Sequence, residues 1–175
     1  MRQAADGTRP PAAAYVAVIG PGAGATPQDV GAAWQVGCLL AERGAIVVCG
    51  GLGGVMAAAA EGAVSRGGLA VGLLPGRDRG AGNPFLSVAL PTGLGELRNG
   101  LVVGVSDAVI AIGGSWGTLS ELALAMRTGK PVVVMGGWSV HDPEPGGGTE
   151  QPERAASAEQ AVEQALTLAA QARPR

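Results

Sequence analysis

The sequence has few of the side chains that usually carry metal or nucleophilic chemistry. Its 175 residues include one histidine, His141, one lysine, Lys130, and two cysteines, Cys38 and Cys49. One histidine and two separated cysteines cannot supply a zinc site with ordinary ligand spacing, so we expect no metal. Both cysteines lie in apolar segments, which predicts buried free thiols in a cytoplasmic protein. Any chemistry must therefore come from carboxylates, arginines, hydroxyls and backbone amides.

Charge and aromatic content exclude further classes of protein. Aromatic residues make up 3% of the chain and apolar residues 47%, so the core must consist of alanine, valine, leucine and isoleucine. The net charge of −2 gives no basic surface for nucleic acid. No apolar run approaches the ~20 residues of a membrane span. Residues 1–14 contain Arg2 and Arg9 but no continuous apolar stretch, and we expect a disordered tail there rather than a secretion signal.

Strand and helix patterns alternate along the rest of the chain. Short runs rich in β-branched residues predict strands, and apolar residues at helical spacing predict helices between them. Such alternation is typical of βαβ crossovers. We predict a single α/β domain over residues 15–172, Rossmann-like and doubly wound, with helices on both faces of a mainly parallel sheet. The predicted strands are 15–19, 45–49, 69–74, 85–90, 107–112 and 132–135, and the predicted helices are 28–43, 54–66, 94–105, 118–128 and 157–170.

Ligands of such sheets bind beyond the carboxyl ends of the strands, and a glycine-rich turn follows the second predicted strand there. Residues 50–56 are Gly-Gly-Leu-Gly-Gly-Val-Met and lead directly into a helix. Glycine leaves the backbone amides open to a ligand, and the start of the helix favours an anion. Gly50, Gly51 and Gly54 are therefore candidate phosphate-binding residues. The alternative is that these glycines only allow the helix to pack closely on the sheet.

A second glycine-rich turn, residues 113–121, is Gly-Gly-Ser-Trp-Gly-Thr-Leu-Ser-Glu. The hydroxyl of Ser115 or Thr118 can donate to a phosphate, and the amides between Gly114 and Thr118 can supplement it. The turn is not a P-loop, because no Gly-Lys-Ser/Thr sequence follows. Glu121 is either a surface acid or capping-box partner of Thr118, or a carboxylate that acts on a bound substrate.

Arg98 and Asn99 lie near the start of the helix predicted over 94–105. A guanidinium at the loop edge of the sheet can bind a phosphate or ribose through two parallel hydrogen bonds. The alternative is a solvated surface charge.

Taken together, these residues resemble the signature of the Lonely Guy (LOG) family. The family pattern runs from an Arg-Lys pair, through an apolar helix, to a Pro-Gly-Gly-x-Gly-Thr-x-x-Glu turn. Arg98-Asn99 and residues 113–121 match it in order. The turn from Gly50 to Met56 is similar to an earlier Gly-Gly-x-x-Gly-x-Met turn of the same family. The resemblance covers residues 15–135.

The resemblance implies a homodimer or higher homo-oligomer that hydrolyses the N-glycosidic bond of a nucleoside 5′-monophosphate to a free base and ribose 5-phosphate. It implies no cofactor. By position, Arg98 and Glu121 would be the catalytic pair. The nucleotide would be held by the other matched residues, namely Gly50, Gly51, Gly54, Met56, Asn99, Gly114, Ser115, Gly117 and Thr118. The label "lysine decarboxylase" that many relatives carry does not suit this chain, because Lys130 precedes Pro131 at a strand start without a cofactor context.

Three departures from the pattern keep a second function open. Asn99 replaces the lysine of the pair, Gly113 replaces the proline, and Ser115 replaces the second glycine. Asn99 and Gly113, together with the Leu119-Ser120-Glu121 ending, make the chain similar to a sister branch of LOG-like proteins. Molybdenum-cofactor carriers, which bind their ligand without hydrolysing it, are similar to that branch. The sequence thus predicts either phosphoribohydrolysis or a non-catalytic carrier or sensor of a phosphorylated ligand. A purely structural domain would require both turns to be empty.

Overall fold

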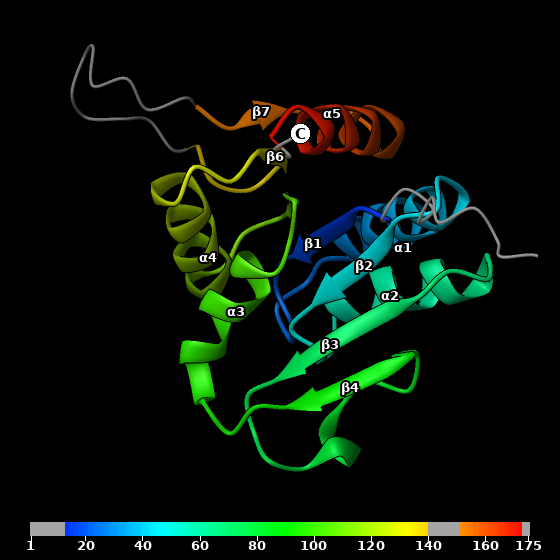
Figure 1. Cartoon of the computed structure of the whole chain (residues 1–175), viewed down its shortest axis with the longest axis vertical. Helices are drawn as coiled ribbons and strands as arrows, with labels where there is room; N and C mark the ends of the chain where they lie inside the picture. The colour runs from blue at the N-terminus through cyan, green and yellow to red at the C-terminus, as the bar shows by residue number, and fades with distance from the viewer. Residues whose placement is uncertain (1–12, 140–150, 173–175) are drawn as a thin grey trace, which may run out of the picture.

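The computed structural model describes residues 13–139 and 151–172, so His141 and residues 1–12 of the predicted tail lie outside the described part. The strands and α-helices below are labelled as in Figure 1. The strands are β1 (Tyr15–Ile19), β2 (Ile46–Cys49), β3 (Ala70–Leu74), β4 (Val88–Pro91), β5 (Ala108–Ile112), β6 (Val132–Met135) and β7 (Glu153–Arg154). The α-helices are α1 (Pro27–Glu42), α2 (Val55–Ser65), α3 (Asn99–Gly104), α4 (Trp116–Arg127) and α5 (Ala158–Ala172), and the 3-10 helices are η1 (Arg79–Ala81) and η2 (Gly95–Arg98).

These strands form one sheet in the order β4-β3-β2-β1-β5-β6-β7, with every pairing parallel. The predicted Rossmann-like α/β class is confirmed. The chain adds β2, β3 and β4 on one side of β1 and then returns to place β5 on the other side (Figure 1). The strand order therefore reverses between β1 and β5. In open parallel sheets this switch point, at the carboxyl ends of the strands, is where ligands bind.

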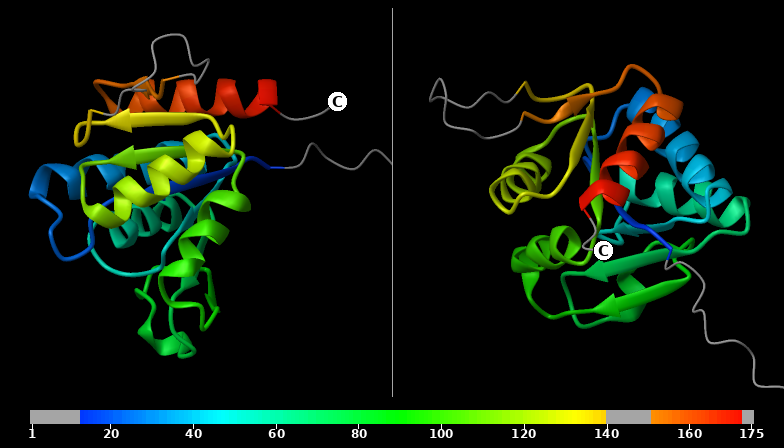
Figure 2. Two further views of the ribbon diagram at one scale, coloured as in Figure 1. Left: turned by 90° about the vertical axis from the view of Figure 1, so that its left-hand side faces the viewer. Right: turned by 45° about the horizontal axis from the view of Figure 1, so that its top comes forward.

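Two helical layers cover the sheet, as Figure 2 shows. One core packs α1, α2 and α5 against one face, and a second core packs α3 and α4 against the other. Alternate residues of a strand enter opposite cores: Val16 and Val18 of β1 join the first, whereas Ala17 and Ile19 join the second. The buried residues of both cores are alanine, valine, leucine and isoleucine, as the low aromatic content predicts. Within the described residues no helix combines the length and the apolarity that a membrane crossing requires.

The predicted elements are confirmed within a few residues, with four differences. The helix predicted over 94–105 is divided into η2 and α3. Helix α4 begins at Trp116 rather than at Thr118, because Ser115 caps it. The strand predicted over 85–90 forms at Val88–Pro91, since the side chain of Asn83 accepts the Phe85 N–H in a turn. The sequence did not predict β7, which is only two residues long.

Glycine brings α1 and α2 into close contact. A Cβ at Gly37 of α1 would overlap the backbone carbonyl of Ala59, and one at Gly62 of α2 would overlap the carbonyl of Trp34. The two backbones therefore pack with no side chain between them at these positions. The buried cysteines, Cys38 of α1 and Cys49 of β2, are both free thiols, as predicted.

Substitution of Gly37 tests this packing. Because the new methyl group has no space, we expect Gly37→Ala to lower the free energy of unfolding by about 1–3 kcal/mol. Gly31 lies exposed on the same helix, and a Cβ there would meet no atom within 4 Å, so Gly31→Ala should be neutral or stabilise the protein by up to about 1 kcal/mol. Urea denaturation followed by circular dichroism measures both variants. Equal effects of the two substitutions would contradict the close approach of α1 and α2.

Candidate functional site

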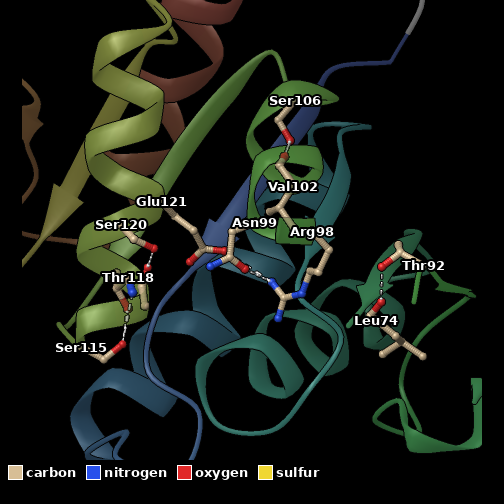
Figure 3. Close-up of polar contacts among 11 residues, drawn as sticks. Leu74, Thr92, Arg98, Asn99, Val102, Ser106, Ser115, Thr118, Ser120 and Glu121 are labelled. Atoms are coloured by element: carbon tan, nitrogen blue, oxygen red, sulfur yellow. Dashed lines mark hydrogen bonds and ion pairs between the residues drawn. The ribbon is translucent and has the colours of Figure 1, made fainter. Parts of the chain in front are cut away.

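The predicted catalytic residues meet at the carboxyl edge of the sheet, on the face covered by α3 and α4. Arg98 ends η2, Asn99 begins α3, and Glu121 lies on α4 (Figure 3). Figure 3 shows the side chain of Glu121 directed from α4 toward Asn99 and Arg98. Arg98 and Glu121 are 23 residues apart in sequence, and the fold brings Arg98 Nη1 to 3.5 Å from Glu121 Oε1.

Arg98 is a buried cation rather than a solvated surface charge. The residue is 8% exposed, and its Nη1 donates to Asn99 Oδ1 at 2.7 Å. Gly50, directly after β2, makes room for the guanidinium, because a Cβ there would lie 2.5 Å from Arg98 Nη2. Arg98 Nε is buried and has no hydrogen-bond partner among the described residues. Since buried donors normally have partners, this unused N–H is a candidate donor to a ligand.

Glu121 is buried as well, being 7% exposed. Burial raises the pKa of its carboxyl to about 7, and the opposing charge of Arg98 limits the rise. The interpretation of Glu121 as a surface acid is therefore wrong. It is also not a capping-box partner of Thr118, since Ser115 is the N-cap of α4 and Thr118 occupies the third helical position.

The second glycine-rich turn joins β5 to α4. Gly113 has φ +63°, which only glycine adopts easily, and a Cβ there would lie 2.6 Å from a carboxylate oxygen of Asp29. Proline, whose φ is fixed near −65°, cannot adopt this conformation. The backbone thus explains why Gly113 stands where the LOG pattern has proline. The turn is closed on the other side by a hydrogen bond from the Gly113 N–H to the Met135 carbonyl at 3.0 Å.

The amino end of α4 leaves two backbone donors unused by the helix. Ser115 Oγ accepts the Thr118 N–H at 3.2 Å and lies 2.9 Å from Thr118 Oγ1, and the first helical bond runs from Leu119 N–H to Ser115 O at 2.9 Å. The N–H groups of Trp116 and Gly117 precede that bond and have no helical acceptor. Together with the dipole of a 12-residue helix, they can receive an anion.

The first glycine-rich turn has a packing role, which the sequence left as one of two alternatives. Gly54 has φ +62°, and a Cβ there would overlap the carbonyls of Pro21 and Gly22 in the loop after β1. The N–H of Val55, at the start of α2, donates to Pro21 O at 3.1 Å, so this helix end already has an internal acceptor. These contacts are typical of close packing. Ligand binding by this turn, through Gly50, Gly51, Gly54 and Met56, stays a prediction.

Three residues near the two turns were not predicted from the sequence. Asn83 donates from Nδ2 to Leu52 O at 3.0 Å and so anchors the first turn. Asp29 lies beside Gly113, and Trp138 donates from Nε1 to Ser115 O at 3.2 Å. Asn83 precedes a proline, which is a turn signal, but no local pattern indicates which distant segment any of these side chains contacts.

A cavity of about 850 Å³ lies at the opposite end of the sheet, near the start of β6. Met126, Lys130 and Leu168 are among its lining residues. Lys130 Nζ donates to the carbonyls of Gly104 and Ser106, and so joins the end of α3 to the start of β6. These contacts give the lysine a structural role, consistent with the argument against decarboxylase chemistry.

Glu121→Gln should change how stability depends on pH. The pKa of Glu121 is about 7 in the folded protein and 4.5 ordinarily, so the folded state binds this proton more tightly than the unfolded chain does. The resulting stabilisation is complete below pH 4.5 and is lost as the pH rises to about 7. From about pH 5 to about pH 8 we expect the free energy of unfolding to fall by about 2 kcal/mol relative to that of Glu121→Gln. Urea denaturation of both proteins measures this difference, and parallel pH profiles would contradict it.

Several solved structures share this fold. A molybdenum cofactor binding protein from Rippkaea orientalis is 35% identical, with a TM-score of 0.79 over 88% of this chain and 96% of that one. The molybdenum cofactor carrier protein of Chlamydomonas reinhardtii is 30% identical, with a TM-score of 0.77 over 91% of this chain and 99% of that one. DNA processing protein A from Helicobacter pylori, at 22% identity and a TM-score of 0.65 over 88% of this chain and 80% of that one, shares the fold alone.

Sequence comparison assigns the family. An uncharacterised protein from Archaeoglobus fulgidus is 46% identical over 111 residues, which are 59% of this chain and 73% of that protein. The model of the SLOG cluster4 family matches residues 13–172. The resemblance to LOG-like proteins, and to the sister branch similar to molybdenum-cofactor carriers, is thus confirmed. This chain belongs to the SLOG cluster4 family.

Proposed function

We propose that this protein binds a phosphorylated small molecule between Arg98 and the amino end of α4 and carries it without cleaving it. The observation that carries the proposal is the buried guanidinium of Arg98, whose Nε has no partner among the described residues. An oxyanion in this place would accept from Arg98 and from the free N–H groups of Trp116 and Gly117. The ligand we propose is a nucleotide or the molybdenum cofactor.

Two further observations support a carrier. The similar proteins from Rippkaea orientalis and Chlamydomonas reinhardtii are described as a molybdenum cofactor binding protein and a molybdenum cofactor carrier protein. Asn99 contributes no charge where the LOG pattern has lysine, and its Oδ1 accepts a hydrogen bond from Arg98. The site therefore has one cation fewer than the LOG pattern. This difference favours either a different ligand or binding without hydrolysis.

A charge placed at Gly117 tests the anion site. Gly117 is exposed, and a Cβ there meets only Ser115 Oγ, at 3.7 Å. A carboxylate this close to a helix start stabilises the helix by about 0.3–1 kcal/mol, so Gly117→Glu should fold. Its negative charge would repel the phosphate, and we expect the purified variant to lack a phosphorylated ligand that the wild type retains. Native mass spectrometry, followed by identification of the released and unchanged ligand, measures this.

Gly117→Gln is the matched control, because it has the same size and no charge, and it should keep the ligand. Wild-type protein that never carries a phosphorylated molecule, or a Gly117→Glu variant that carries as much as the wild type, would rule out the carrier proposal.

Phosphoribohydrolysis is a second candidate, favoured by the burial of Arg98 beside Glu121. In this reaction the bond between C1′ and the base nitrogen breaks, water adds its oxygen to C1′, and a proton goes to the base. A carboxylate at Glu121 would stabilise the developing positive charge or activate the water. A pKa of about 7 is suited to a general base at neutral pH. Arg98 would orient the nucleotide and keep part of Glu121 ionised.

Glu121→Gln separates this reaction from binding. We expect it to abolish hydrolysis of AMP while AMP binding is retained, because the amide keeps the shape of the side chain but cannot accept a proton. Release of ribose 5-phosphate measures turnover, and isothermal titration calorimetry measures binding. If the wild type leaves AMP and related monophosphates intact at high enzyme concentration, the hydrolase candidate is excluded and the carrier proposal is unaffected.

A further inference from the structure

Two of the three tryptophans of this chain meet at the second glycine-rich turn. The sequence contains three Trp, one Tyr and one Phe, so large rings are rare in it. Trp116 and Trp138 have ring centroids 5.2 Å apart and planes inclined by 41°. Trp116 is 77% exposed and Trp138 37% exposed. An aromatic pair with so much surface in water adds little to the stability of the core. Its position at the turn therefore needs another explanation.

Trp138 is fixed against the turn and supports Trp116. Its Nε1 donates to Ser115 O at 3.2 Å. Its ring lies over Gly114, where a Cβ would come within 2.9 Å of Cδ1. Residue 114 must therefore be small for the ring to sit there. Trp138 thus connects the loop after β6 to the start of α4, and its ring lies against one side of Trp116.

Trp116 is placed next to the proposed anion site. It occupies the first position of α4, and helical side chains lean toward the amino end of their helix. Trp116 therefore carries both one of the two N–H groups that the helix does not use and an indole ring on a side chain that leans toward the same end of the helix. A ligand whose phosphate accepts from these groups has an exposed aromatic surface within reach of the rest of the molecule.

We propose that Trp116, supported by Trp138, is the stacking surface for a planar heterocycle joined to the bound phosphate. This inference rests on the proposed function, whose nucleotide or molybdenum-cofactor ligand carries such a ring, and adds the residue that recognises the ring. Trp116 is then a residue that determines specificity. Stacking on aromatic side chains tolerates different rings because each has a π-face, which suits binding that does not read one base.

The test compares two phosphate esters, one with an aromatic base and one without. AMP and ribose 5-phosphate are titrated calorimetrically into Glu121→Gln protein, so that AMP is not consumed, with and without Trp116→Ala. We expect the parent to bind AMP more tightly than ribose 5-phosphate. Trp116→Ala should weaken AMP binding by roughly tenfold and leave ribose 5-phosphate binding unchanged, because stacking is worth about 1–3 kcal/mol per base. Trp116→Phe should restore most of the AMP affinity.

Trp34→Ala is the control, since Trp34 is the third tryptophan of the chain and lies on α1, which covers the other face of the sheet. It should leave both affinities unchanged. The inference is overturned if Trp116→Ala does not alter AMP affinity, if both ligands lose affinity by the same factor, or if the substitution acts by changing the oligomeric mass. Failure of the parent to bind either ligand would instead overturn the proposed phosphate site, and this inference with it.

Discussion

The site depends on two opposite charges buried together at the carboxyl edge of the sheet. Arg98 and Glu121 are 8% and 7% exposed, and their nearest charged atoms are 3.5 Å apart. Removing two charges from water is unfavourable, and the pair offsets that cost only in part, as the raised pKa of Glu121 shows. A core selected for stability alone would replace them with apolar side chains. Their presence at the switch point is what the proposed ligand site would require.

Small residues make this arrangement sterically possible. Gly50 leaves room for the guanidinium of Arg98, and Gly113 reaches the start of α4 through a backbone conformation that proline cannot adopt. On the other face, Gly37 and Gly62 let α1 and α2 approach closely. The cores are filled by alanine, valine, leucine and isoleucine, whereas Trp116 and Trp138 keep exposed surface beside the second glycine-rich turn.

A carrier and a hydrolase of this family would share one anion site and differ in how they treat the bound ligand. A carrier needs affinity, which Arg98 and the amino end of α4 can supply without further chemistry. Hydrolysis needs interactions that strengthen in the transition state, and Glu121 is the residue able to provide them. Under the proposed function the chemistry would thus be decided at Glu121 and at Asn99, which accepts from Arg98 and adds no second cation.

Local patterns in the sequence were enough to predict the α/β class, most element positions and the second glycine-rich turn. Strand and helix periodicity, and glycine where the chain turns, depend on neighbours along the chain. The LOG resemblance further indicated Arg98 and Glu121 as a pair. The position of the second turn between a strand and a helix was predicted for the same local reason, although α4 begins two residues earlier than expected because Ser115 caps it.

The tertiary structure decided which alternatives hold. Burial of Arg98 and Glu121 and the docking of Trp138 on Ser115 each join residues 23 positions apart, and no local pattern encodes such a contact. The role of Gly54 likewise depends on the loop after β1, whose carbonyls occupy the space where a side chain would lie. The sequence by itself determined where most strands end and most helices begin, to within a few residues. Only the folded chain determined which helix start keeps N–H groups free for a ligand. Distant segments that pack against a helix start decide whether its N–H groups already have acceptors.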